Sequence, residues 1–380
     1  MAKLGDICTI QSGGTPSRSN KDYWDNGTIP WVKISDFSGK YLSQTSEKIT
    51  QAGLDGSSAK IFPKGTILYT IFATLGETCI LDIDATTNQA IAGLKLNDES
   101  VSLDYLYYYL LSKKEYVNEI GRGVAQNNIN MKILREMEIV IPSKEEQKRI
   151  TDVLNKVYTL IDLRKEQIAK LDQLVKSRFI ELFDGYAETT KLSEVAVVTG
   201  GLTKNSKRDQ LPLRMPYLRV ANVAFASIDV TEMLDIGLTR DEYEKTLLEY
   251  EDMLFVEGNG SPDQIGRVAI WRSEITPCVH QNHLIKARFN QGVVKPVFAM
   301  HYFMSQGGRE QIKSKAVSTS GLFTLSVSKV ADLLMPVPPM DLQADFVTFV
   351  EQTDKSKLVI QQSLDKLETL KKSLMQEYFG

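Results

Sequence analysis

A tandem internal repeat is the feature that most constrains how this chain can fold. Ile141-Pro142 followed by Gln147 recurs as Val337-Pro338 followed by Gln343, at an offset of 196 residues. The same offset relates further residues along the chain, namely Lys170-Leu171 with Lys366-Leu367, Leu174 with Leu370, and Phe183 with Phe379. One register kept over so long a segment indicates two copies of one structural unit.

Shorter segments upstream repeat in the same order, with offsets between 186 and 196 residues. They pair Leu4-Gly5-Asp6-Ile7 with Leu192-Ser193-Glu194-Val195, Gly13-Gly14-Thr15 with Gly201-Leu202-Thr203, Trp31-Val32-Lys33 with Tyr217-Leu218-Arg219, and Thr87-Asn88-Gln89-Ala90-Ile91 with Val279-His280-Gln281-Asn282-His283-Leu284. The drifting offset is typical of loop insertions. We therefore predict a first domain at 1–142, a long helix at 143–185, a second domain at 186–338 and a second long helix at 339–380.

Each predicted domain combines short apolar runs with one helical patch, which predicts an α/β fold with mixed short-strand sheets. The expected strands are 66–72, 79–83, 92–96, 253–256 and 266–271, and the expected helices are 103–117 and 297–306. The tyrosines at positions 105, 107, 108 and 109 have helical spacing, so we assign them to the core rather than to a stacking platform.

The two long segments carry apolar residues alternately three and four apart, which is typical of a coiled coil. Ser143 is the expected N-cap of the first helix. The seam positions expected to pair the two antiparallel helices, or to dock a partner, are Ile161, Ile168, Leu171, Val175, Ile360, Leu364, Leu367 and Leu374. Leu160, Leu174, Phe179 and Leu370 widen this apolar stripe and predict a second face for a partner protein.

Composition limits the function classes. The net charge of −3 and the pI of about 5.8 argue against a simple basic DNA-binding protein. Five cations nevertheless gather between Thr203 and Arg219, where a solvated loop is the simplest interpretation. Three widely spaced cysteines suit a reducing compartment, and we find no apolar run of membrane length and no export signal. The sequence therefore predicts a cytoplasmic protein.

The usual catalytic motifs are missing from the sequence. It contains no phosphate-binding loop, no dinucleotide fingerprint, no nucleophile elbow, and no Asn/Asp-Pro-Pro-aromatic tetrad of an amino-methylating enzyme. We therefore expect no catalytic residues, and we reject a stand-alone methyltransferase. Cys278, His280 and His283 could ligate zinc, but the first repeat has no matching ligands, so we favour structural or DNA-facing histidines and expect no metal.

The ordered motifs make the whole chain resemble the specificity subunits of Type I restriction–modification systems. The residues that carry the resemblance are Leu4-Gly5-Asp6-Ile7, Gly13-Gly14-Thr15-Pro16, Pro30-Trp31-Val32, Asn88-Gln89, His280-Gln281-Asn282-His283 and Ile141-Pro142 with Glu146-Gln147-Lys148-Arg149-Ile150. The resemblance implies a non-catalytic subunit with two target recognition domains, each contacting one half of a bipartite site in double-stranded DNA. It also implies a helical spacer that docks modification (methyltransferase) subunits, two of them by expectation, and through these the restriction subunits. S-adenosylmethionine, ATP and Mg would then belong to the partners, with no cofactor in this chain.

Amides and cations suit the edges of bases in the major groove, with Arg or Lys matching guanine and Asn or Gln matching adenine. On that basis the candidate DNA contacts are Lys33, Ser35, Asn88, Gln89, Lys204, Arg208, Arg219, Asn222, His280, Gln281, Asn282 and His283. Gln89 and Gln281 could instead brace a loop. The alternative from another class is a coiled-coil adaptor with two ligand-binding domains and no role on DNA.

Overall fold

The structure, a computed structural model, describes the whole chain except residues 123–127, 187 and 320. The chain divides into two compact units, one with residues 1–165 and 362–380, the other with residues 166–361. Each unit contains one α/β domain and a part of each long helix. The predicted fold class, two similar α/β domains with two long antiparallel helices, is confirmed.

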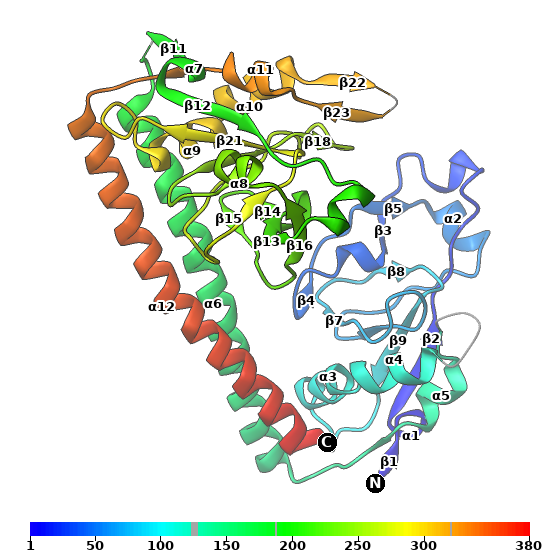
Figure 1. Cartoon of the computed structure of the whole chain (residues 1–380). Helices are drawn as coiled ribbons and strands as arrows, with labels where there is room; N and C mark the ends of the chain where they lie inside the picture. Colours follow the sequence, from blue (N-terminus) through cyan, green and yellow to red (C-terminus); the bar gives the residue numbers. More distant parts are fainter. Residues whose placement is uncertain (123–127, 187, 320) are drawn as a thin grey trace. The chain divides into compact units, whose positions relative to one another are not determined.

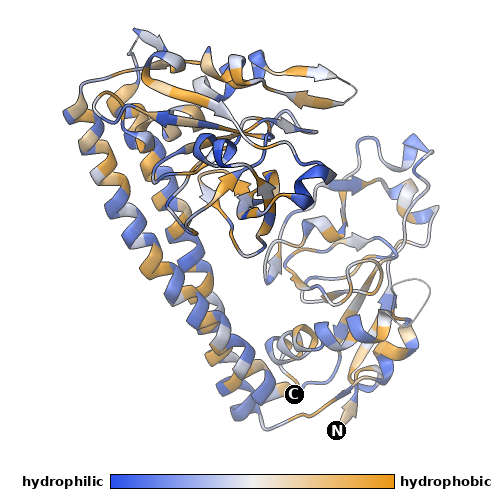
Figure 2. Ribbon diagram, in the orientation of Figure 1, coloured by the Kyte–Doolittle hydropathy of each residue, from blue (hydrophilic) through white to orange (hydrophobic). Residues whose placement is uncertain are grey.

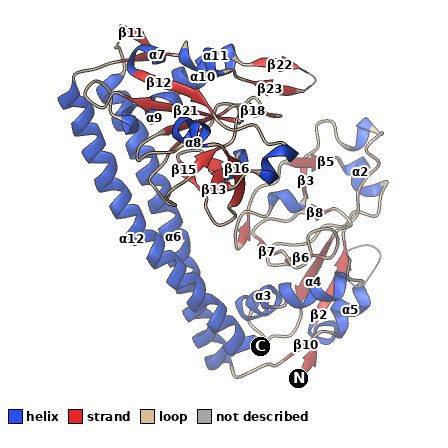
Figure 3. Ribbon diagram, viewed as in Figure 1, coloured by secondary structure: helices blue, strands red, loops and turns tan. Residues whose placement is uncertain are grey.

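The domain of the first unit has a five-stranded sheet in the order β2-β9-β6-β7-β4. Figure 3 distinguishes the short strands from the helices. A second sheet has the order β5-β3-β8, with β8 parallel to β3, and β1 pairs with β10. The strands are β1 (Ala2–Lys3), β2 (Cys8–Ser12), β3 (Ile29–Val32), β4 (Tyr41–Leu42), β5 (Glu47–Ile49), β6 (Ile67–Thr70), β7 (Thr78–Leu81), β8 (Thr86–Thr87), β9 (Ile91–Leu96) and β10 (Glu138–Ile139). The helices are α1 (Leu4–Ile7), η1 (Lys21–Tyr23), η2 (Ile34–Asp36), α2 (Gln51–Asp55), α3 (Leu103–Ser112), α4 (Lys114–Arg122) and α5 (Met131–Glu136).

The second domain repeats this plan, with sheets in the orders β12-β21-β17-β19 and β16-β13-β20 and with β11 paired to β24. It adds the hairpin β14-β15 and the sheet β18-β23-β22. The strands are β11 (Thr189–Lys191), β12 (Ala196–Gly200), β13 (Leu213–Leu218), β14 (Val223–Ala224), β15 (Ser227–Ile228), β16 (Leu234–Leu238), β17 (Met253–Val256), β18 (Gly258–Asn259), β19 (Val268–Ile270), β20 (Val279–His280), β21 (Leu284–Phe289), β22 (Val317–Thr319), β23 (Leu322–Thr324) and β24 (Leu334–Pro336). The helices are α7 (Leu192–Val195), η3 (Ser206–Gln210), η4 (Val220–Asn222), α8 (Arg240–Thr246), α9 (Pro296–Met304), α10 (Gln306–Lys315) and α11 (Val327–Ala331).

The central strands are apolar throughout because both faces of their sheet are covered. In β6, Ile67 and Tyr69 face the core that contains α3, whereas Leu68 faces a second core beside Val32. In β17, alternate residues enter two separate cores in the same way. The four tyrosines of α3 are buried, so their assignment to the core is confirmed.

The long helices α6 (Lys144–Phe183) and α12 (Met340–Phe379) lie side by side and antiparallel (Figure 1). Ion pairs between them join Lys165 Nζ to Glu368 Oε1 at 3.4 Å in the first unit and Lys357 Nζ to Asp172 Oδ1 at 3.0 Å in the second. The expected N-cap is confirmed, because the backbone N of Glu146 donates to Ser143 Oγ at 3.2 Å. The helices thus begin and end within two residues of the predicted bounds.

The predicted seam positions are covered to different degrees. Ile161, Val175 and Leu364 are buried. The other five are half-buried, namely Ile168, Leu171, Ile360, Leu367 and Leu374. Phe179, which we had placed on the widened stripe, is buried against Phe298 and Phe346 of the second unit.

The repeated glutamines fasten each long helix to its own domain through the same bonds. Gln147 Oε1 accepts from Ser102 N at 2.7 Å, and its Nε2 donates to the carbonyls of Ser100 at 2.8 Å and Pro142 at 2.9 Å. Gln343 makes the matching bonds to Lys295 N, the Val293 carbonyl and the Pro338 carbonyl at 2.8, 3.1 and 2.7 Å. Both side chains are fully buried, which explains why this residue recurs in the repeat.

We expect Gln147→Ala and Gln343→Ala each to lower the free energy of unfolding by about 2–4 kcal/mol, because each loses three hydrogen bonds and leaves buried backbone groups unpaired. Urea unfolding measures the change. Gln352→Ala, at an exposed position of α12, is the control and should change stability by less than about 0.5 kcal/mol. Equal effects at buried and exposed glutamines would contradict this role.

Candidate nucleic-acid interface

In both domains one local arrangement brings the predicted contact residues together. Lys33 N donates to Asp36 Oδ2 at 2.8 Å, which turns the chain after β3, and Arg219 N donates to Asn222 Oδ1 at 2.9 Å after β13. The strand that pairs with it in parallel, β8 in the first domain and β20 in the second, is followed by another turn. Asn88 N donates to the Val32 carbonyl at 3.2 Å, and Gln281 N to the Leu218 carbonyl at 3.0 Å. In each domain the turn after β3 or β13 therefore lies beside the turn after β8 or β20.

A glycine lets a third segment approach these turns. The backbone of Gly13 lies so close to Thr87 and Asn88 that a Cβ would overlap them, and Gly201 has the same relation to His280 and Gln281. The residue after each glycine donates its N–H to a neighbouring carbonyl, Gly14 to Thr87 and Leu202 to His280, both at 2.8 Å. These bonds make Thr87 the structural equivalent of His280 and Asn88 that of Gln281.

In the first domain, charged and polar side chains form one cluster. Glu47 pairs with Lys33 through its Oε1, at 2.6 Å from Nζ, and with Arg18 through its Oε2. Its two cation partners hold the pKa of the Glu47 carboxyl below its usual value, against the opposing effect of burial. Gln89 is exposed and accepts from the hydroxyl of Thr15. Of the other predicted contacts in this domain, Ser35 is exposed and Asn88 is half-buried, with its Oδ1 accepting from Ala90 N at 3.0 Å.

In the second domain several predicted contacts are engaged inside the protein. Arg208 donates through Nη1 and Nη2 to Glu242, at 3.0 and 2.7 Å, and its side chain is only 11% exposed. Asn222 is buried and donates to the carbonyls of Asp229 and Glu232. Arg219 is half-buried and also donates to the Glu232 carbonyl, at 3.0 Å. Arg208 and Asn222 would have to leave these partners to contact a base, whereas Nη1 of Arg219 makes no hydrogen bond within the described residues.

Other side chains of the second domain remain available at this surface. Lys204 is exposed, as are its neighbours Lys207 and Arg214. Gln281 and Asn282 are half-buried, and within the described residues their side chains make no hydrogen bond. The two amides lie in the turn after β20, and Lys204 follows Leu202, whose backbone bonds to His280 and Asn282 in that turn.

The histidines differ sharply in exposure. His280 is fully buried and its Nδ1 lies 3.0 Å from the Thr246 carbonyl, so we leave it out of the proposed surface. His283 is exposed, with its Nδ1 2.7 Å from Glu257 Oε2. The described part of the chain holds no group of three or more His, Cys, Asp or Glu side chains arranged to bind a metal ion.

Burial makes the stability of the second unit sensitive to mild acid. All three histidines of the chain lie in this unit, and burial lowers the pKa of His280 and His301 to about 4. Unfolded histidine has a pKa of about 6.5, so stability is complete above this value and is lost as the pH falls toward 4. Going from pH 7 to pH 5 should therefore lower the free energy of unfolding by about 2 kcal/mol per buried histidine.

Urea unfolding at the two pH values tests this expectation. His301→Phe should remove about half of the loss, because one of the two titrating groups is gone. His283→Gln, at an exposed position, should leave the loss unchanged. A loss of the same size in His301→Phe and in the unmodified protein would contradict the assignment.

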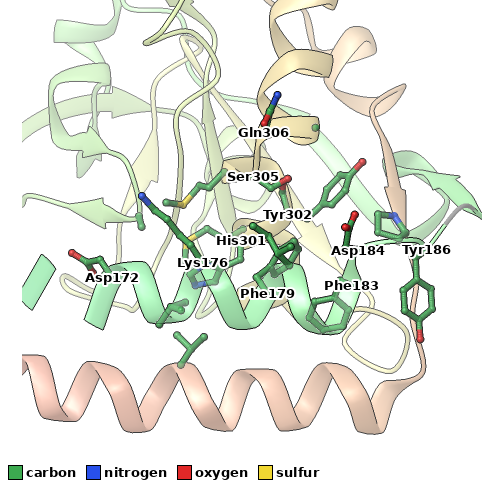
Figure 4. A pocket seen from close by; sticks show the side chains of 18 of the residues that line it. Asp172, Lys176, Phe179, Phe183, Asp184, Tyr186, His301, Tyr302, Ser305 and Gln306 are labelled. Carbon is green, nitrogen blue, oxygen red and sulfur yellow. The ribbon is translucent and has the colours of Figure 1, made fainter. Parts of the chain in front are cut away.

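The second unit also contains a pocket of about 980 Å³ (Figure 4). Its walls come from the last turns of α6, from α9 and α10, and from the early part of α12. Phe179, Phe183 and Met300 are among its apolar lining residues, and Lys176 and Asp172 are among its charged ones. Ile180 also lines the pocket and is 57% exposed. The pocket therefore continues into the apolar surface of α6.

Known proteins resemble this chain in sequence and in fold. Residues 1–173 match the family described as the Type I restriction modification DNA specificity domain. The MjaIX specificity subunit of a Type I restriction enzyme from Methanocaldococcus jannaschii is 27% identical, over 98% of this chain and 90% of the relative. The S subunit of a Type I restriction–modification system from M. genitalium has a TM-score of 0.55 and 17% identity, covering 100% of this chain and 95% of that one.

A further solved structure, from work on complex assembly and conformational transition of the type I R-M system, has a TM-score of 0.61 and 15% identity, covering 100% of this chain and 96% of that one. At this identity the two solved structures show a shared fold. This chain and both solved structures thus share one fold, in which two α/β domains are combined with two long helices. The predicted resemblance is confirmed: residues 1–173 match the DNA specificity domain of Type I restriction–modification systems, and nearly the whole chain is similar to a specificity subunit of such a system.

Among the described helices, none is both long enough and apolar enough to cross a membrane.

Proposed function

We propose that this chain recognises the two halves of a split DNA site, one with each α/β domain, and performs no catalysis itself. The observation that carries the proposal is the duplicated arrangement of turns, because it places a separate set of amides and cations on each domain. The candidate contacts are the exposed or half-buried members, namely Lys33, Ser35, Asn88, Gln89, Lys204, Arg219, Gln281, Asn282 and His283.

The acidic composition is compatible with this proposal if partners supply much of the contact with phosphates, which dominates affinity for DNA. The partners would be modification subunits, which bring S-adenosylmethionine and adenine methylation, and restriction subunits, which bring ATP-driven, Mg-dependent cleavage. The family match favours this reading over the adaptor alternative, which gives the domains no role on DNA.

The long helices would dock the modification subunits. Hydrophobic and hydrophilic residues alternate along each helix (Figure 2). Large apolar side chains are exposed along both of them. These are Leu160, Leu163, Leu174 and Ile180 on α6 and Leu358, Val359 and Leu370 on α12. Exposed apolar residues gathered on a helix are typical of a protein–protein contact. The pocket beside Ile180 extends this surface.

Methyl transfer tests the proposal in a purified system. The isolated chain should transfer no label from S-adenosylmethionine to duplex DNA, and transfer should begin when the modification subunit encoded with it is added. The modification subunit alone should show no sequence preference. Label transfer by the isolated chain, or the same methylated sequence without it, would refute the proposal.

A further inference from the structure

The first domain holds one arginine in a setting unlike that of any predicted contact. Arg18 lies on the segment after Gly13-Gly14, and its guanidinium carbon lies 3.7 Å from the ring centre of Trp24 and 4.7 Å from that of Trp31. Its side chain is still 52% exposed. Because the rings of Trp24 and Trp31 are nearly perpendicular, at 89°, they confine the guanidinium from two directions while about half of the side chain stays open to solvent.

The segment that carries Arg18 is itself anchored at several points. Trp31, which is buried, donates from Nε1 to the Gly14 carbonyl at 3.0 Å, and Trp24 donates from Nε1 to the Ser17 carbonyl at 3.1 Å. Thr15 bonds to Gln89 on the turn after β8. Arg18 thus shares Glu47 with Lys33, and its segment is bonded to Gln89, two of the proposed contacts.

The hydrogen bonding of Arg18 leaves a pair of donors free. Its Nη1 pairs with Glu47, but within the described residues Nε and Nη2 make no hydrogen bond. Arg208 of the second domain is the contrasting case, because Nε, Nη1 and Nη2 all donate to groups of the protein. An arginine with two adjacent free donors matches the O6 and N7 acceptors of guanine.

We infer that Arg18 contacts a guanine edge in the half-site of the first domain, with Glu47, Trp24 and Trp31 as positioning residues. The inference rests on the proposed function. It adds a specificity-determining residue that the sequence did not single out. Trp24 and Trp31 confine the guanidinium from two directions, and Glu47 holds its Nη1, while Nε and Nη2 make no hydrogen bond within the described residues.

Methylome sequencing tests this inference, with the full chain and its modification subunit expressed in a host that lacks adenine methylation. Arg18→Ala should reduce the preference for guanine at one position of one half-site by about 10- to 100-fold, and should leave the other half unchanged. Arg18→Lys should relax the same position, because lysine keeps the charge but cannot form two parallel hydrogen bonds. Glu47→Gln should relax that position by a smaller factor.

Arg272→Ala is the matched control. Arg272 also lies over an aromatic ring, that of Tyr250, and pairs with a glutamate, Glu251, at 3.0 Å, with 41% of its side chain exposed. It is not part of the proposed surface, so both half-sites should stay unchanged. An unchanged motif in both Arg18 variants would overturn the inference, whether total methylation stayed normal or fell uniformly as for a lost phosphate contact. If the proposed function itself were wrong, the result would be different, because even the chain without substitutions would produce no split motif.

Discussion

Exchanging residues 1–142 for the corresponding domain of a related specificity subunit should replace one half of the methylated motif and leave the other half intact. The first domain has its own cores around Leu68 and around Trp31, shares the core around Ile67 with the long helices, and has its own cluster of polar side chains at the turns. A transplanted domain therefore brings its complete recognition surface with it. Since each mismatched base pair costs about 1–3 kcal/mol, a half-site of several base pairs should change completely.

The junction for the exchange follows from the glutamine contacts. Gln147 bonds to the carbonyl of Pro142 and to two groups of the loop before α3, so the donor domain must offer the same backbone groups. The reciprocal exchange of residues 186–338 serves as the control and should replace only the other half. If either exchange changed both halves together, the assignment of one domain to one half-site would be wrong.

Loss of the modification subunit is the expected result of the double variant Leu358→Asp, Val359→Asp. These side chains are 59% and 66% exposed on α12, so the variant chain should fold normally. If the partner covers both, each contributes about 1.5–3 kcal/mol of apolar burial, and their replacement by charges should weaken the complex at least about 100-fold. Size-exclusion chromatography of the mixed subunits measures the loss.

Two single variants separate docking from folding. Lys366→Asp changes the charge at an exposed position of the same helix and should assemble normally. Leu364→Asp replaces a buried seam residue and should lower the free energy of unfolding as well. Normal assembly of the Leu358, Val359 variant would show that the partner binds another face.

The order of domains and long helices along the chain could be predicted from the sequence, because apolar runs and heptad spacing can be recognised within short segments. β17 has the predicted bounds, Met253–Val256, since a buried strand with turns on both sides has a clear apolar pattern. The long helices follow from their heptads. Two-residue strands such as β8 (Thr86–Thr87) escaped prediction, because a period of two residues cannot be recognised over so short a segment.

The candidate surface was predicted less completely, because contacts distant in sequence decide which side chains are available. Arg208 is a plausible base contact by residue type, but Glu242, on a helix 34 residues later, engages it. Arg18 was missed because its setting depends on Trp24, Trp31 and Glu47, which no local pattern links. His280 was predicted to face DNA, yet β20 places it in the interior.

The most direct test of two-domain recognition is to sequence the methylated adenines of a host that carries this chain with its modification subunit. We expect two short specified blocks of bases separated by a gap of fixed length and free sequence, with methylation in both blocks. Omitting this chain should abolish the pattern. A single continuous motif, or the same motif without the chain, would contradict the account.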